Sequence, residues 1–418
     1  MLSRNLLRHL ACVAALAISG LICQARVKPG IEVLRDRGFE GLKGRRVGLL
    51  TNPSGVDSQL RSTIDILKEN VNLVALYAPE HGVRGDVWAG GKVASDRDPA
   101  TGLPVHSLYG ATRQPTPEML EGVDVIVYDI QDVGVRSYTF ISCLGLMMRS
   151  CAELGIEVMV LDRPNPLGGL KVEGPVVREG FFSYVGQYPI PYVYGLTVGE
   201  VALMINEEGM NRGQKGDAAP LSCKLTVIPM EGWERSMTYD ATGLPWVMPS
   251  PNIPYPRSAI CYPCSGLAGE FNNYLNIGIG YTIPFDAFAA EWIDADTLKA
   301  ELDSCRLPGI AWRTVHYTPF YGSCARKLIH GVQFYFTDYE AAPITLLQFY
   351  VMQAVYKLYG KTPFQLSPDR VSMFNKVCGT DFVSSVFSKS LQVSDILSYW
   401  TADAEDFKTL SKKYWIYR

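Results

Sequence analysis

The stretch from about residue 45 to residue 162 most constrains the fold, because short apolar runs alternate there with segments of helical periodicity. Near-continuous apolar strands separated by helices are typical of a parallel β-sheet covered by helices on both faces. The expected strands are 46–52, 71–77, 123–129 and 156–162, and the expected helices are 62–70, 116–122 and 137–155. The sequence therefore predicts a doubly wound, Rossmann-like α/β domain.

Beyond about residue 220 the pattern changes. Proline and aromatic residues crowd 242–256, which predicts a long irregular segment. A helix over 295–305, a strand over 328–338, a helix over 343–360 and a helical tail to the chain end follow. We therefore expect a Rossmann-like domain over 26–220 and a smaller C-terminal α/β domain over 221–418.

The first 25 residues have the layout of a secretory signal peptide. Arg4 and Arg8 precede an apolar run that ends near Cys23, and small residues follow up to Ala25. Gly20 stands where a lipoprotein signal usually has leucine, which makes a lipid anchor on Cys23 the less favoured interpretation. The sequence predicts export to the periplasm or beyond, with cleavage near Ala25 and no membrane insertion afterwards.

Bulk composition narrows the possible partners. A net charge of −3 gives no basic field for nucleic acid, and 47% hydrophobic with 19% charged residues is typical of a packed globular protein.

Two short motifs bear on cofactors and metals. TNPSG follows the first strand in place of a GxGxxG motif, which argues against a dinucleotide-binding site. The CYPC motif at 261–264 has no second Cys or His pair, so it predicts packing or a local disulfide. No metal and no cofactor are expected.

Four of the expected strands end in polar segments rich in Gly and Pro. Parallel strands end on the same edge of their sheet, and ligands bind outside those carboxyl ends. The four segments are TNPSG (51–55), APEHGVRGD (78–86), DIQDVGVRSY (129–138) and DRPNPLGG (162–169). We therefore expect a pocket there, lined by Glu80, His81, Arg84, Asp129, Asp132, Arg136, Asp162, Arg163 and Asn165.

Carboxylates mixed with arginines suit two chemistries. One carboxyl can protonate a glycosidic oxygen while a second carboxylate stabilises or attacks the sugar, and arginines can hold an anionic sugar. Asp129 and Asp132 can alternatively bind Mg²⁺ in a hydrolase or phosphoryl-transfer site. Spacing alone leaves both alternatives open.

Taken together, LLTNPSGVD, LYAPEHGVRGD, VIVYDIQDVGVRSYTF, LDRPNPLGG, GLPWVMPSPNIP and PFDAFAAEWID resemble the NamZ-type exo-β-N-acetylmuramidases over roughly residues 30–418. That family was long known only as a domain of unknown function. The resemblance implies an active site in the cleft between two domains. It also implies release of β-1,4-linked N-acetylmuramic acid from the non-reducing ends of peptidoglycan fragments.

The resemblance also suggests roles for individual residues. The PEHG motif places the catalytic acid at Glu80, with His81 either in its hydrogen-bond network or structural. The DxQDxGxR stretch supplies a second carboxylate, Asp129 or Asp132, or groups that position the substrate. Arg84 and Arg136 are the candidates for the lactyl carboxylate of muramic acid. The expected substrate-binding residues are Asn52, His81, Arg84, Gln131, Arg136, Tyr138, Arg163, Asn165 and Asn252.

One position departs from the family pattern, in which an arginine commonly lies between two glycines ahead of the PF motif. Here Ile279 lies between Gly278 and Gly280. This difference predicts a different sugar, a different aglycone or weaker binding, with catalysis in the first domain retained. A non-catalytic muropeptide-binding protein is the alternative, and a metal-dependent hydrolase ranks third.

Overall fold

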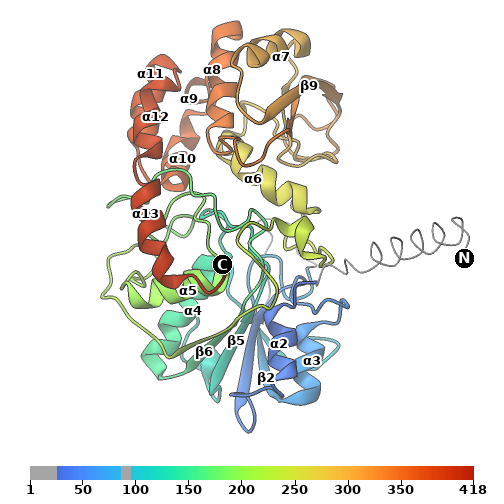
Figure 1. The fold of residues 1–418 in the computed structure, drawn as a ribbon, viewed down its shortest axis with the longest axis vertical. Helices are drawn as coiled ribbons and strands as arrows, with labels where there is room; N and C mark the ends of the chain where they lie inside the picture. The colour runs from blue at the N-terminus through green and yellow to red at the C-terminus, as the bar shows by residue number, and fades with distance from the viewer. Residues whose placement is uncertain (1–25, 86–95) are drawn as a thin grey trace, which may run out of the picture.

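The computed structural model describes residues 26–85 and 96–418, which form two α/β domains stacked along the long axis of the molecule (Figure 1). The predicted signal peptide, residues 1–25, lies outside the described residues, as does Asp86 at the end of the second polar segment.

The first domain contains a seven-stranded sheet in the order β3-β4-β2-β1-β5-β6-β7. Every neighbouring pair from β4 to β7 is parallel, and β3 is an antiparallel edge strand. The predicted doubly wound parallel sheet is confirmed. The strands are β1 (Arg46–Thr51), β2 (Asn72–Ala78), β3 (Asp96–Arg97), β4 (Pro104–Ser107), β5 (Val125–Asp129), β6 (Glu157–Leu161) and β7 (Leu225–Ile228).

Helices cover both faces of this sheet because the central strands β1, β5 and β6 bury apolar side chains on both sides. Helices α2 (Gly30–Asp36) and α3 (Thr63–Asn70) pack on one face, and α4 (Phe140–Leu154) and α5 (Val198–Glu207) on the other. Ser62 caps α3 by accepting a 3.1 Å hydrogen bond from the Ile64 amide, and Gly155 ends α4 with a left-handed φ of 70°. The segment expected as a short helix forms only the 3-10 turn η1 (Glu118–Leu120).

The second domain combines a small antiparallel sheet with helices, as expected. Strands β8 (Ala287–Ala290), β10 (Ile329–Phe336) and β9 (Ile310–Tyr317) pair in that order. The irregular segment 242–256 precedes this domain. Its helices are α6 (Pro256–Gly269), α7 (Ala295–Ser304), α8 (Leu347–Tyr359), α9 (Pro363–Leu366), α10 (Val371–Cys378), α11 (Phe382–Ser390), α12 (Ser394–Thr401) and α13 (Ala404–Ser411).

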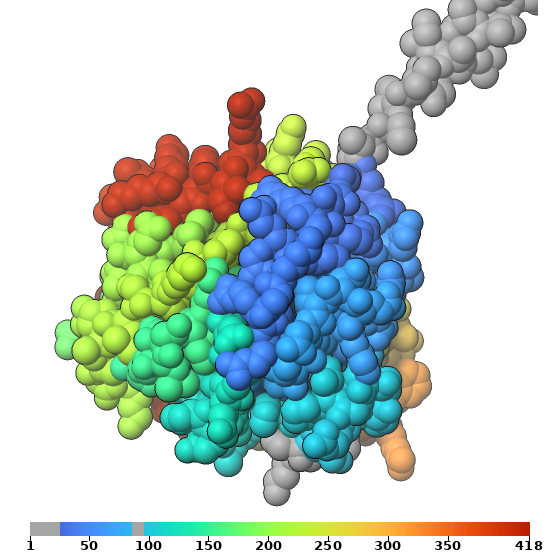
Figure 2. All heavy atoms as spheres, turned by 90° about the horizontal axis from the view of Figure 1, so that it is seen from below, coloured from blue at the N-terminus to red at the C-terminus, as the bar shows by residue number. Residues whose placement is uncertain are grey.

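The domain boundary predicted at residue 220 is wrong, because β7 pairs with β6 and so belongs to the first sheet. The chain also returns at its end, since Tyr417 donates a 2.6 Å hydrogen bond to Asp162 at the end of β6. Seen from below, the C-terminal segment lies along one side of the first domain (Figure 2). The change of domain falls near the start of α6.

All eight cysteines of the described chain are free thiols. Cys261 and Cys264 are fully buried in α6, so the packing interpretation of CYPC is correct and the local disulfide is not formed. No helix within 26–85 and 96–418 is long and apolar enough to cross a membrane.

Candidate active site

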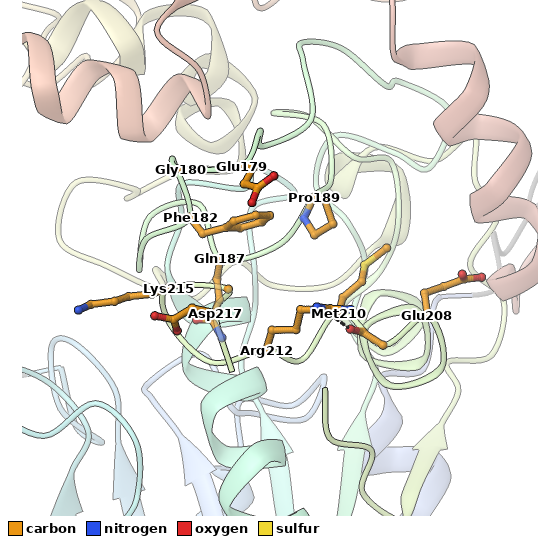
Figure 3. A pocket seen from close by; sticks show the side chains of 12 residues that line it. Glu179, Gly180, Phe182, Gln187, Pro189, Glu208, Met210, Arg212, Lys215 and Asp217 are labelled. Atoms are coloured by element: carbon orange, nitrogen blue, oxygen red, sulfur yellow. Dashed lines mark hydrogen bonds between the residues drawn. The ribbon is translucent and has the colours of Figure 1, made fainter. Parts of the chain in front are cut away.

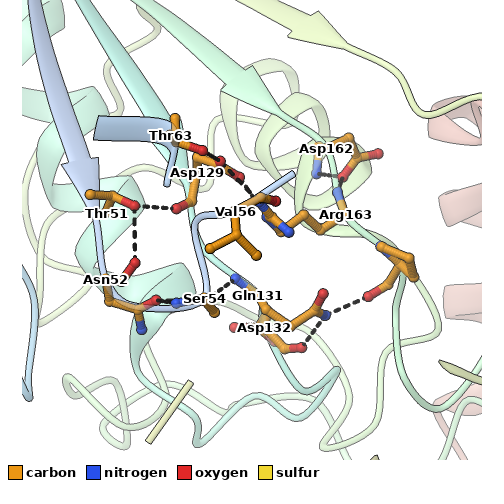
Figure 4. Close-up of polar contacts among 12 residues, drawn as sticks. Thr51, Asn52, Ser54, Val56, Thr63, Asp129, Gln131, Asp132, Asp162 and Arg163 are labelled. Carbon is orange, nitrogen blue, oxygen red and sulfur yellow. Dashed lines mark hydrogen bonds and ion pairs between the residues drawn. The ribbon is translucent and has the colours of Figure 1, made fainter. Parts of the chain in front are cut away.

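The four polar segments meet at one edge of the first sheet, as the sequence predicts. Figure 4 shows three of them, the segments after β1, β5 and β6. A Cβ added to Gly85 would lie 2.5 Å from Cγ of Pro53, so the loops after β1 and β2 touch. The Gln131 amide donates a 2.9 Å hydrogen bond to Oγ of Ser54, and Gln131 Nε2 donates a 2.7 Å bond to the Pro164 carbonyl. The loop after β5 therefore joins the loops after β1 and β6.

Asp129 is buried inside this network. Arg163 binds it through two hydrogen bonds, Nε to Oδ1 at 2.5 Å and Nη2 to Oδ2 at 2.9 Å, and Thr63 donates its hydroxyl to Oδ2. Asp129 is 0% exposed and Arg163 is 5% exposed. The predicted catalytic role of Asp129, its Mg²⁺ role and the substrate role of Arg163 are contradicted, because each side chain satisfies the other.

Asp132 differs from Asp129 because one of its oxygens is unused. Oδ1 accepts hydrogen bonds from the Tyr194 hydroxyl at 2.7 Å and the Gly134 amide at 2.8 Å. Oδ2 is buried and has no hydrogen-bond partner among the residues described. Burial raises the pKa of Asp132 to about 6, although these hydrogen bonds act in the opposite direction. Asp132 is therefore the better candidate for the second carboxyl.

Arg136 does not face a substrate. Its guanidinium is 0% exposed and donates to four backbone carbonyls, those of Pro175, Ile190, Val377 and Cys378. The last two lie at the C-terminal end of α10, where a cation is favourable. The predicted contact between Arg136 and a lactyl carboxylate is therefore wrong, because this arginine joins the first domain to the second.

Arg84 is also engaged within the protein. It donates from Nε and Nη2 to the two carboxylate oxygens of Asp98, at 2.9 and 3.0 Å. The hydrogen bond from Arg84 is the main reason that the pKa of Asp98 falls to about 2. This pairing contradicts Arg84 as a free anion-binding fork.

Several other predicted contacts hold loops in place. Asn52 donates to the Pro249 carbonyl at 3.0 Å, and Asn165 donates to the Leu196 carbonyl at 2.9 Å. Both are buried, as are Gln131 and Asp162, and the amides of Asn52 and Asn165 are used within the protein, whereas Oε1 of Gln131 has no partner among the described residues. These four side chains shape the edge of the sheet instead.

Glu80 occupies the tight turn that follows β2. His81 has a left-handed φ of 75°, Gly82 has a φ of 79°, and the Gly82 amide donates to the Pro79 carbonyl at 3.2 Å. A left-handed non-glycine residue is unfavourable and persists where the surroundings fix it, often at functional sites. His81 is buried, whereas Glu80 keeps part of its surface exposed.

Four tyrosines respond to the charge of the Glu80 carboxyl. Burial raises the pKa of each phenol, and the negative charge of Glu80 raises each further. The pKa of Tyr109 reaches about 12 through burial, that charge and a hydrogen bond with Glu80. The charge of Asp132 acts on two of the same phenols. The four are Tyr109, Tyr138, Tyr184 and Tyr262.

One of these tyrosines places Glu80 near the junction of the two domains. Tyr262 lies in α6 at the start of the second domain, and its hydroxyl lies 3.1 Å from Oγ of Ser137 in the first. Tyr138 packs edge-on against Tyr262 with ring centroids 5.8 Å apart. Of the predicted substrate-binding residues, Tyr138 comes closest to its expected role, because its phenol responds to the charges of both Glu80 and Asp132.

The sequence analysis missed Tyr109, Tyr184, Tyr262 and Arg113. Tyr109 follows β4, whose pairing with β2 brings its carboxyl end to the same edge as Glu80. Recognising β4 would have identified Tyr109. The Arg113 guanidinium lies 4.4 Å from the centroid of the Tyr184 ring, and its charge lowers the pKa of Tyr109 and Tyr184. Arg113 Nε has no partner among the described residues.

A separate pocket of about 800 Å³ lies between segments 179–189 and 208–217 (Figure 3). None of its lining residues belongs to the four polar segments. Its walls carry both acidic and basic side chains, including Glu179, Arg212 and Asp217. Size alone does not make it the site, because the predicted titratable residues lie elsewhere.

Comparison with known proteins decides the family. The N-terminal domain model of exo-β-N-acetylmuramidase NamZ matches residues 47–257, and the C-terminal domain model matches residues 260–417. The chain belongs to the NamZ family. The boundary between the two NamZ models falls at the start of α6, in agreement with the structure.

Relatives within the NamZ family extend over nearly the whole chain. The peptidoglycan β-N-acetylmuramidase NamZ of Bacillus subtilis is 40% identical over 394 residues, which cover 94% of this chain and 92% of the relative. A crystal structure of a DUF1343 family protein from Bacteroides fragilis has a TM-score of 0.88 at 50% identity, covering 94% and 99% of the two chains. A second DUF1343 protein of that organism has a TM-score of 0.74 at 28% identity, with the same coverage.

Proposed function

We propose that this protein is an exo-acting glycoside hydrolase that releases β-1,4-linked N-acetylmuramic acid from the non-reducing ends of peptidoglycan fragments. The observation that carries the proposal is the position of Glu80, a half-buried carboxyl whose charge acts on phenols near the junction of the two NamZ domains. Membership of the family supports the same reaction, and the substrate is a peptidoglycan-derived saccharide.

Glu80 acts as the general acid. It donates its proton to the departing glycosidic oxygen as the bond to the anomeric carbon breaks, and positive charge develops on the sugar ring. The charge of the Glu80 carboxylate raises the pKa of the Tyr109 phenol, so this hydroxyl is the polar neighbour we assign to the acid. Glycosidases commonly pair such an acid with a second carboxyl, and Asp132 is our candidate, since it acts on the same phenols and keeps a free oxygen.

Arg113 replaces Arg84 and Arg136 as our candidate for the lactyl carboxylate. Asp98 engages the Arg84 guanidinium, and backbone carbonyls engage that of Arg136. Arg113 lies over Tyr184, and its Nε is unpaired within the described part of the chain. A guanidinium at this place complements an anionic sugar held against Glu80.

The decisive experiment measures hydrolysis of a chromogenic N-acetylmuramic acid glycoside by wild type and by Glu80→Gln. We expect the variant to lose about 10²- to 10⁴-fold in kcat, the range for loss of an acid–base catalyst. Glu121→Gln is the matched control, because Glu121 is exposed just before β5, at the opposite end of the strand from the site. Unchanged turnover in Glu80→Gln would remove Glu80 from the mechanism.

Two further outcomes separate the alternatives. Saturable binding of the glycoside without any product from wild type would indicate a muropeptide-binding protein. Loss of turnover in excess EDTA, restored by added divalent metal, would indicate a metal-dependent hydrolase, whereas acid catalysis by Glu80 continues with the chelator present.

We also propose that residues 1–25 direct export and are removed. In support, the first described residues are part of the folded domain, with the Val27 amide bonded to the Thr242 carbonyl at 3.1 Å and the Lys28 amide to the Glu231 carbonyl at 2.9 Å. N-terminal sequencing of the protein from a cell envelope fraction should give a chain that starts near Arg26. An intact Met1 in a soluble cytoplasmic fraction would contradict export.

A further inference from the structure

The turn between β9 and β10 exposes large aromatic side chains. Phe320 is 70% exposed and Tyr321 is 56% exposed. Tyr281 stacks on Phe320, with ring centroids 5.7 Å apart and an interplanar angle of 25°. Its other neighbour is Tyr317, at 4.9 Å and 26°. We call Tyr281, Phe320 and Tyr321 the aromatic platform.

The aromatic platform is rigidly supported by the stretch that departs from the family pattern. Gly280 has a φ of 87°, and a Cβ added there would lie 2.0 Å from the Tyr321 carbonyl oxygen. The Phe320 amide donates to the Gly280 carbonyl at 2.7 Å, and Asn276 Nδ2 donates to the Ser323 carbonyl at 3.1 Å. Ile279 therefore belongs to the segment, residues 276–280, that holds the loop of the platform in place.

Contacts connect the aromatic platform to the candidate active site. Tyr321 donates its hydroxyl to Oδ1 of Asn252 at 3.1 Å, across the junction between the two domains. Two residues earlier in the same irregular segment, Ser250 acts on Tyr138 and lowers its pKa, and Tyr138 is one of the phenols that respond to Glu80. Asn252 thus connects the platform to the segment that reaches these phenols.

We propose that the aromatic platform is a second saccharide-binding subsite, which stacks against a sugar ring of the glycan beyond the scissile bond. This inference rests on the proposed function, because an exo-acting enzyme holds the terminal sugar at Glu80 and leaves the rest of the chain outside. Sugar rings carry an apolar C–H face, and exposed aromatic rings with a polar edge suit that face. The occupant is the uncharged N-acetylated sugar that follows the terminal residue, or one further along.

The test compares two substrates with Phe320→Ala and Tyr321→Ala. One substrate is a peptidoglycan tetrasaccharide with terminal N-acetylmuramic acid, and the other is the same sugar on a small phenolic aglycone. We expect KM for the tetrasaccharide to rise roughly three- to tenfold, the range for losing one aromatic contact, with kcat retained. KM for the small glycoside should stay within about twofold.

Controls separate stacking from folding. Leu328→Ala removes an equally exposed apolar side chain, 57% exposed, from the same loop and should change neither KM. Phe320→Trp should keep or improve tetrasaccharide binding, because the larger ring still stacks. Equal rises in KM for both substrates, or no rise for the tetrasaccharide, would contradict the proposal that the aromatic platform binds a sugar ring.

Failure of the proposed function is a distinct result. If wild type cleaves neither substrate, the exo-muramidase assignment fails. Calorimetric titration of wild type and Phe320→Ala with the tetrasaccharide then tests the subsite alone. A weaker affinity in the variant supports a saccharide platform in a binding protein, and equal affinity overturns it.

Discussion

Arg163 and Asp129 form a two-pronged ion pair at the centre of the sheet edge, with Nε to Oδ1 at 2.5 Å and Nη2 to Oδ2 at 2.9 Å. The pair links the end of β5 to the loop after β6. Both partners are almost completely buried, so each is the counterion that keeps the other from being an isolated charge. The pair, with the hydrogen bond from Arg163 Nη2 to the Val56 carbonyl, therefore joins the loops after β1, β5 and β6.

Arg163→Met should destabilise the protein by about 3–5 kcal/mol, because it leaves a buried carboxylate without its counterion. Denaturant unfolding at neutral pH measures the change. Arg46→Met is the matched control, since Arg46 pairs with Asp124 at the surface, with the two side chains 53% and 36% exposed. Its loss should cost no more than about 1 kcal/mol. Equal effects from the two substitutions would show that the buried pair has no special role.

Asp132 should make stability depend on pH in the direction opposite to an ordinary salt-bridged carboxylate. Burial raises its folded pKa to about 6, above the usual 3.8. The neutral form is therefore favoured in the folded state, and this stabilisation is complete below about pH 4 and lost as pH rises through about 6. Asp132→Asn removes the titration while keeping an acceptor for Tyr194.

The free energy of unfolding of Asp132→Asn, relative to wild type, should thus increase between pH 4 and pH 7. The change should reach at most about 3 kcal/mol. Denaturant titrations at a series of pH values measure it. Asp124→Asn should show the opposite trend at lower pH, because the hydrogen bond from Arg46 lowers the pKa of Asp124 to about 2. A constant difference between Asp132→Asn and wild type would contradict the protonation of Asp132 in the folded state.

Apolar periodicity sufficed to predict the sheet and the edge where its loops meet. The runs that became β5 and β6 are buried at every position, which is the pattern of strands covered on both faces. The short strands β4 and β7 carried no such pattern, since they span four residues each and include half-exposed positions. Missing β7 put the domain boundary too early.

The sequence alone does not show which polar side chains remain free to bind a substrate in the folded protein. Arg136 lies in a motif that looks like a substrate-binding loop, yet its carbonyl partners Val377 and Cys378 are more than 240 positions away. Arg84 and Asp129 are likewise satisfied by partners that only tertiary structure brings near. Pairing between distant residues is set by the fold, so a count of charges at an edge overestimates the groups free to bind.

Arg113→Gln should reduce the preference for an anionic sugar. We expect kcat/KM for an N-acetylmuramic acid glycoside to fall about tenfold or more, the effect of losing a charge-assisted hydrogen bond. The matching N-acetylglucosamine glycoside lacks the lactyl carboxylate, so its kcat/KM should change little. Arg212→Gln, at the separate pocket, is the control and should affect neither. A parallel loss on both sugars would show that Arg113 acts through the fold or through Glu80.

Tyr109→Phe should lower kcat for the N-acetylmuramic acid glycoside. The charge of Glu80 raises the pKa of the Tyr109 phenol, so this hydroxyl is a polar neighbour of the carboxyl proposed as the acid. Removing the hydroxyl should reduce kcat about three- to tenfold, the effect of losing one hydrogen-bonding group at the site. Tyr138→Phe is the comparison, because the charge of Glu80 contributes least to the raised pKa of that phenol, and this variant should reduce kcat less. An unchanged kcat in Tyr109→Phe would show that the hydroxyl takes no part in the reaction, and an equal loss in both variants would show that the two phenols act through the packing of the site.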